Sequence, residues 1–104
     1  MYEEMFPYRL AKLRNNKGVS ARDMSLSIGQ NAGYINNIET GKALPSMASF
    51  FYICEYLGIT PKDFFDFEAQ DPVMQKELIA KIKLLDTQQL ETISALIDGL
   101  TVRK

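Results

Sequence analysis

The stretch GYINNIETGK, residues 33–42, decides the fold. Ile35 and Ile38 are three residues apart, the spacing that places two side chains on one face of an α-helix. Asn36 and Asn37 lie between them, and Asn37 points away from that face. Asparagine is a poor helix former, so its presence twice needs a reason other than helix stability. The pattern therefore predicts a helix with one buried apolar face and one face that offers amides to an external partner.

Residues that favour helix starts and helix ends alternate along the whole chain, and strand-like alternation is absent. The candidate caps are Ser20, Asn31, Ser46, Thr60, Asp71 and Asp86, and the candidate stops are Gly18, Gly29, Gly41 and Gly58. The sequence therefore predicts an all-α protein with helices over residues 7–16, 20–28, 31–40, 46–57, 60–67, 72–85 and 87–102.

Each of the first five predicted helices carries only a narrow apolar stripe, so these helices must pack around a shared core. The residues expected in that core are Leu10, Leu13, Met24, Ile28, Ile35, Ile38, Met47, Phe50, Ile53, Cys54, Leu57, Phe64 and Phe65. Only Gly29 and Gln30 separate Ile28 from the expected cap Asn31. So short a connection forces the second and third helices to cross steeply, which is the helix-turn-helix arrangement.

Composition excludes most enzyme classes. The chain has 104 residues, one cysteine and no histidine, so it cannot form an internal disulfide, a histidine-containing zinc site or a histidine-based catalytic dyad. No apolar run is long enough to span a bilayer, and the first residues, MYEEMFPYR, are unlike a secretory signal. We therefore expect a cytoplasmic protein that is not an enzyme and uses no cofactor and no metal.

The formal net charge of −1 argues at first against a nucleic-acid partner. The charges are unevenly distributed, however, because residues 9–42 carry six cations against two anions. Fields act locally within a Debye length of about 8 Å at physiological salt. A basic patch on an acidic protein is therefore expected in this part of the chain.

An ordered set of motifs carries a family resemblance. It comprises LRNNKG at 13–18, SARDM at 20–24, Ser25 at the helix contact, Gly29 in the turn, YINNIETGK at 34–42, LPS at 44–46, YLGITP at 56–61 and DFF at 63–65. Over residues 9–65 the chain resembles the Cro/C1-type, or XRE family, helix-turn-helix regulators. The chain departs from the family pattern in three places: Ala21 replaces a glutamine, Gln30 replaces an apolar turn residue, and the third helix opens with Ala32 and Gly33, which have almost no reach.

The resemblance implies a five-helix lambda-repressor-like DNA-binding domain over residues 1–67. It also implies a sequence-specific transcriptional regulator, a repressor, that inserts its third helix into the major groove. Such a protein would bind a short inverted repeat of double-stranded DNA as a homodimer. An alternative is a protein-interaction module or antitoxin-like partner built on the same fold.

In a major-groove complex the outer face of the third helix would contact bases. The candidate base contacts are Asn31, Ala32, Gly33, Asn36 and Asn37. An asparagine amide pairs with adenine N6 and N7, and Asn37 is the first choice for this contact. The alternative for Asn36 and Asn37 is a solvated helix face.

The candidate DNA-backbone contacts are Arg22, Tyr34, Thr40 and Lys42. Tyr34 has an alternative as a packing residue between helices, and the basic residues have an alternative as solubilising surface charges. The resemblance further implies a structural salt bridge between Arg14 and Glu39, which ties the first helix to the third.

Residues 68–104 form a C-terminal helical extension beyond the resemblance. Leu90, Ile93, Leu96, Ile97 and Leu100 recur at the spacing of a helix-packing seam. We expect a C-terminal helical hairpin that supports dimerisation. Two alternatives are that the hairpin caps its own domain or that it binds another protein.

Overall fold

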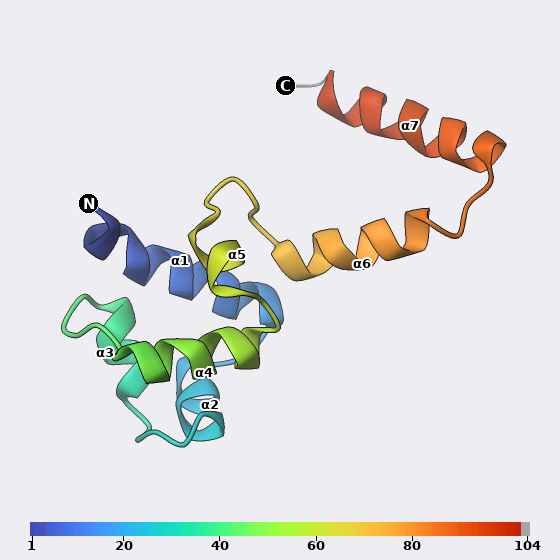
Figure 1. Cartoon of the computed structure of the whole chain (residues 1–104). Coiled ribbons are helices and arrows are strands. Elements are labelled where there is room, and N and C mark those ends of the chain that lie inside the picture. Colours follow the sequence, from blue (N-terminus) through green and yellow to red (C-terminus); the bar gives the residue numbers. More distant parts are fainter. Residues whose placement is uncertain (103–104) are drawn as a thin grey trace. The chain divides into compact units, whose positions relative to one another are not determined.

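The computed structural model describes residues 1–102, and every regular element within them is an α-helix (Figure 1). The last two residues of the predicted extension, 103–104, lie outside the described residues. The helices are α1 (Tyr2–Lys17), α2 (Ala21–Ser27), α3 (Tyr34–Glu39), α4 (Met47–Leu57), α5 (Pro61–Phe65), α6 (Pro72–Ile82) and α7 (Thr87–Thr101). Among the described residues, no helix is both long and apolar enough to cross a membrane.

The chain divides into two compact units, which are described separately. The first unit runs from Met1 to Val73 and holds α1 to α5, and the second begins at Met74. The core of the first unit consists of Phe6, Leu10, Leu13, Met24, Ile35, Ile38, Phe50, Ile53, Cys54, Leu57, Ile59 and Phe64. Five short helices thus share one apolar centre, because none of them has enough apolar surface to be stable by itself.

The observed core differs from the predicted core at a few residues. Met47 is 65% exposed because it is the first residue of α4, and Phe65 is 41% exposed because its neighbour Phe64 takes the inward position. Phe6 and Ile59 were not predicted and are buried. Met47 and Phe65 are therefore wrong as core positions, Ile28 is only half-buried against the core, and the aromatic contribution of the first turns of α1 was missed.

Helix α1 begins five residues before the predicted start and continues through Pro7. The missing amide hydrogen of Pro7 removes one helical hydrogen bond. Packing compensates for that loss, since the Phe6 ring lies 4.7 Å from Phe64 and 5.8 Å from Phe50, measured between ring centroids. The prediction that Pro7 marks the helix start is wrong because burial of Phe6 outweighs one hydrogen bond.

Four of the predicted N-caps are confirmed by hydrogen bonds. Ser20 accepts from the Asp23 amide at 3.0 Å, Ser46 from Ser49 at 3.1 Å, Thr60 from Asp63 at 3.1 Å and Asp86 from Gln89 at 2.8 Å. Each cap satisfies an amide that the first helical turn cannot bond internally. Helices α5 and α6 end two and three residues before their predicted ends.

The second unit leaves its apolar faces open. Leu78 on α6 is 48% exposed, and Leu96, Ile97 and Leu100 on α7 are 59%, 49% and 60% exposed. Near the connection between the two helices, Ile82, Leu85 and Ile93 are half-buried. A hairpin in which α6 and α7 bury their apolar faces against each other is therefore not what a single copy of the chain forms.

Candidate nucleic-acid interface

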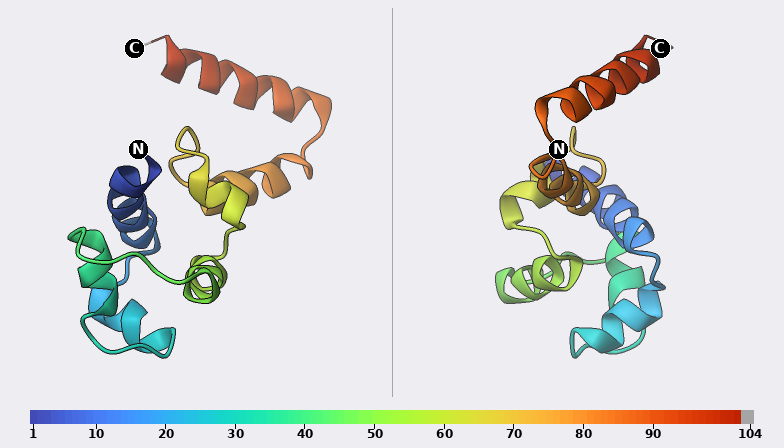
Figure 2. Two further views of the ribbon diagram at one scale, coloured as in Figure 1. Left: turned by 60° about the vertical axis from the view of Figure 1, so that its left-hand side comes forward. Right: turned by 90° about the vertical axis from the view of Figure 1, so that its right-hand side faces the viewer.

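Helix α3 has the two-faced character that its sequence predicts. Ile35 and Ile38 are 0% and 1% exposed and face the core, whereas Asn36 and Asn37 are exposed. Helices α2 and α3 lie against each other in the first unit (Figure 2). In the part of the chain that the structure describes, the side-chain amides of Asn36 and Asn37 form no hydrogen bond to the protein. These two side-chain amides are therefore available to an external partner.

The buried Ser25 hydroxyl joins α2 to α3. It accepts a hydrogen bond from the Ile35 amide at 3.0 Å and donates one to the Ala21 carbonyl at 2.7 Å. The Ile35 amide belongs to the first turn of α3, where a helix has no internal acceptor to offer. Ser25 was predicted only as a small residue at the helix contact. Its hydroxyl is in fact what satisfies and positions the start of α3.

The last residue of α3 is anchored to α1. The Arg14 guanidinium donates to both carboxylate oxygens of Glu39, from Nε at 2.7 Å and from Nη2 at 2.9 Å. Its Nη1 donates to the Val19 carbonyl at 2.8 Å. The two charged side chains are only 16% and 12% exposed. Donation of hydrogen bonds to the Glu39 carboxylate raises the pKa of Arg14. Ser25 thus holds the first turn of α3, and the Arg14–Glu39 ion pair holds its last residue.

The turn before α3 differs from the prediction that Asn31 caps the helix. The N-cap is Gly33, which has no capping side chain, and residues 31–33 form a turn. The Asn31 Oδ1 atom accepts from the Gly33 amide at 3.1 Å and so closes this turn. The Asn31 side-chain oxygen thus already accepts one hydrogen bond within the turn, whereas the side-chain oxygens of Asn36 and Asn37 accept none from the described residues.

The candidate backbone contacts have different surroundings. Arg22 and Lys42 are exposed, while Tyr34 is half-buried and packs against the core cluster. Thr40 is exposed, but its hydroxyl donates to the Asn36 carbonyl at 2.8 Å. That hydrogen is therefore committed to the end of α3. Ala32, among the candidate base contacts, is half-buried, and Gly33 is exposed.

The basic patch is smaller than the charge count suggested. Arg9 is 5% exposed, and Arg14 is neutralised by Glu39. The exposed cations among residues 9–42 are Lys12, Lys17, Arg22 and Lys42. The Lys17 ammonium lies 5.0 Å from the centre of the Tyr56 ring. Counting charges along the sequence thus overstated the surface charge, because two of the arginines have structural roles.

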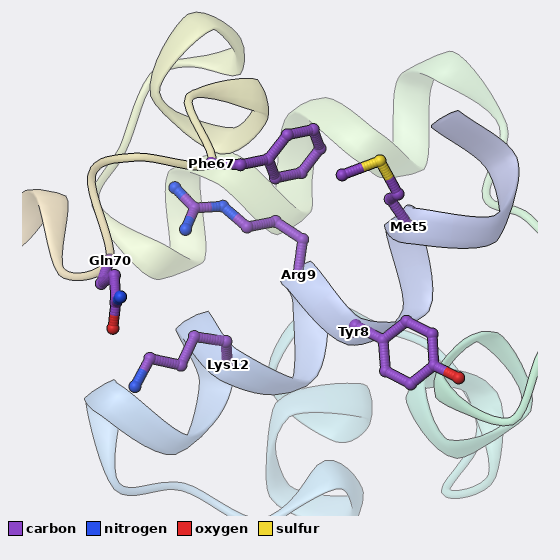
Figure 3. A pocket seen from close by; sticks show the side chains of 6 residues that line it. All are labelled: Met5, Tyr8, Arg9, Lys12, Phe67 and Gln70. Atoms are coloured by element: carbon purple, nitrogen blue, oxygen red, sulfur yellow. The ribbon is translucent and has the colours of Figure 1, made fainter. Parts of the chain in front are cut away.

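Arg9 joins α1 to the segment that follows α5. Its Nε donates to the Phe64 carbonyl at 2.6 Å, and its Nη2 lies 2.8 Å from the Asp63 carbonyl and 2.9 Å from those of Asp66 and Ala69. Figure 3 shows this side chain reaching toward Phe67 in a groove of about 320 Å³. Burial lowers the pKa of Arg9, and the carboxylates of Asp66 and Asp63 act in the opposite direction. Its place on the apolar stripe of α1 was the signal that could have revealed this role.

Comparison with protein families identifies the first unit. A family model described as a helix-turn-helix domain matches residues 8–69, which is more than half of the chain. No curated protein and no solved structure gives a significant match. Membership of this family indicates DNA binding. The chain, with α2 and α3 as its paired helices, belongs to the helix-turn-helix domain family.

Proposed function

We propose that the protein is a sequence-specific DNA-binding transcriptional regulator of the Cro/C1 type, with a lambda-repressor-like first domain over residues 1–67 and a C-terminal extension over 68–104. It acts as a repressor by placing α3 in the major groove of a short inverted repeat. It binds as a homodimer and has no catalytic activity and no cofactor.

The observation that carries this proposal is the fixed presentation of α3. A helix of six residues would not be stable alone. Its two isoleucines are buried, its first turn is bonded to Ser25, and its last residue is paired with Arg14. Exposed asparagines on the remaining face are held in one orientation by these contacts. A rigidly held polar helix face is what direct base recognition requires.

Within this proposal Asn37 and Asn36 contact base edges, and the turn of Asn31, Ala32 and Gly33 lies close to the groove. Arg22 and Lys42 contact phosphates, which positions α3 without reading sequence. Tyr34 and Thr40 contribute less, since the ring of Tyr34 packs on the core and the hydroxyl of Thr40 bonds within α3.

Selection of bound duplexes from a random pool, done with the full chain and with two variants, tests this division of roles. Asn37→Ala should relax the preference at one base position by about 1 to 3 kcal/mol. Lys42→Ala should weaken binding to all sequences alike and reduce the dependence of affinity on salt. Recovery of no common motif by the parent protein would contradict base recognition. Uniform losses for both variants would contradict the separate roles.

A groove on the first unit favours the second candidate function, a protein-interaction module. It has a volume of about 240 Å³ and is lined by apolar side chains, among them Tyr2, Leu44, Met47, Phe50 and Phe65. Exposed aromatic surface of this kind suits a protein partner better than a phosphate backbone. Tight binding to a co-encoded protein with no retention of DNA would favour this function. A steep fall of duplex affinity with salt would favour the first.

A further inference from the structure

Helix α7 has an apolar face that is left open within its own unit except at Ile93, which is half-buried. The helix spans Thr87–Thr101, and none of its residues is buried. Leu90, Leu96, Ile97 and Leu100 are 38% to 60% exposed. An isolated helix of this length is marginal in water, so its capped start alone does not account for its stability. A partner that covers this face would stabilise the helix.

Four of the five apolar residues of this face, all except Leu96, are placed symmetrically along the helix. Leu90, Ile93, Ile97 and Leu100 follow one another at separations of three, four and three residues. Both the spacing and the residue types are unchanged when the helix is reversed. Two copies of α7 packed antiparallel would therefore place Leu90 against Leu100 of the second copy and Ile93 against Ile97 of the second copy. Antiparallel packing also aligns the two helix dipoles favourably.

The charges of α7 permit this self-association. Its two charged residues, Glu91 and Asp98, each follow a seam residue by one position, which turns them about 100° further around the helix. They therefore lie away from the middle of the seam. Beside the seam, Ser94 and Thr101 are small and uncharged. The seam itself carries no charge, so it neither repels a second copy nor selects a partner of opposite sign.

We propose that α7 is an isologous dimer interface, in which the seam of Leu90, Ile93, Ile97 and Leu100 packs antiparallel on the same seam of a second copy across a two-fold axis. This inference rests on the homodimer of the proposed function and names its surface. Four seam residues per copy make a small interface, so the dimer dissociates reversibly at micromolar concentration.

A matched pair of substitutions tests the surface by sedimentation analysis of the full chain over a range of concentrations without DNA. Ile97→Asp places a charge in the seam and should weaken the dimer by about tenfold or more. Ala95→Asp places the same charge on the opposite side of α7 and should leave the dimer unchanged. Circular dichroism serves as the folding control. A monomeric parent protein, or equal effects of the two variants, would overturn the proposal.

Engineered cysteines test the orientation, and the native Cys54 does not interfere because it is 2% exposed. Under mild oxidation, a mixture of the Leu90→Cys and Leu100→Cys variants should form a mixed disulfide dimer. Leu90→Cys alone should not cross-link, since its two copies would lie about 15 Å apart along an antiparallel pair, beyond the reach of a disulfide. Efficient cross-linking of Leu90→Cys alone would overturn the antiparallel arrangement.

The two proposals can fail separately. A stable α7 dimer that retains no DNA duplex would contradict the proposed function and support this interface. Sequence-specific duplex binding by a homodimer that forms equally well with Ile97→Asp would contradict the interface and support the function.

Discussion

At the scale of single residues, two buried polar side chains determine how the candidate interface is held. Ser25 is 0% exposed and Arg9 is 5% exposed, and both side chains form hydrogen bonds with backbone groups. A buried backbone group without a partner costs about 1 to 3 kcal/mol. These two side chains therefore contribute to stability by satisfying backbone atoms at the start of α3 and at the end of α5.

Cys54 predicts a loss of stability at alkaline pH. Burial, together with the Asp63 carboxylate, raises the pKa of its thiol from 9.0 to about 11. Between these values the unfolded chain releases the thiol proton and the folded chain keeps it, so the free energy of unfolding falls as pH rises. The thiol's contribution should decrease by about 2 to 3 kcal/mol from pH 8.5 to pH 11.

Urea unfolding of the parent protein and of Cys54→Ala at several pH values measures this effect. Tyrosine and lysine titrations are common to both proteins. The difference between their free energies of unfolding, plotted against pH, therefore reports the titration of the thiol. The curves should converge as pH rises from 8.5 to 11. Curves that stay parallel would show that the thiol does not titrate differently in the folded chain.

At the scale of elements, the two glycines that flank α3 differ in whether the backbone needs a glycine at that position. Gly41 has φ +80°, a conformation that side chains with a Cβ rarely adopt. Gly33 has φ −94° and ψ 0°, and an added Cβ would meet only the Asn31 Oδ1 atom at 3.8 Å. The fold therefore requires glycine at position 41 and does not require it at position 33.

Alanine at these two positions should separate stability from recognition. Gly41→Ala should lower the free energy of unfolding by about 1 kcal/mol because of backbone strain. Gly33→Ala should change stability by less than about 0.5 kcal/mol and weaken duplex binding, because a methyl group would intrude where the turn approaches the groove. Urea unfolding and fluorescence anisotropy with a selected duplex measure the two effects. Unchanged affinity of Gly33→Ala would place the turn away from the bases.

Local sequence patterns predicted some features of the helices and mispredicted others. The spacing of Ile35 and Ile38 predicted the buried face of α3, and N-cap residues predicted the starts of α2, α4, α5 and α7. These are local signals, decided by residues within one or two turns. The start of α1 and the turn at Asn31 were mispredicted, because packing of Phe6 and the hydrogen bond to Gly33 depend on the surrounding structure.

At the scale of the whole molecule, the first unit includes part of the connecting segment. Arg9 bonds to the Ala69 carbonyl, Asn16 donates to the Gln70 carbonyl at 2.7 Å, and Pro72 is buried. The predicted division at residue 67 stays a prediction about domains. These contacts nevertheless show that residues after Phe67 contribute hydrogen bonds to α1.

Two truncated chains test this contribution. A chain ending at Val73 should be more stable than one ending at Phe67 by roughly 1 kcal/mol, because the shorter chain loses the Ala69 and Gln70 acceptors, while Arg9 keeps the carbonyls of Asp63 and Asp66. Urea unfolding followed by circular dichroism compares them, with the full chain as reference. Equal midpoints for the two truncated chains would show that water replaces these acceptors at no cost.

By itself the sequence determined an all-helical chain, the two-faced α3 and the short turn that pairs it with α2, because helix periodicity, caps and glycine turns act between near neighbours. Only the tertiary structure decided which charges reach the surface. Arg9 and Arg14 counted toward a basic patch, yet one bonds to carbonyls more than fifty residues away and the other to Glu39. The physical reason is that a charge's partner, and hence its role, depends on which distant segments the core brings together.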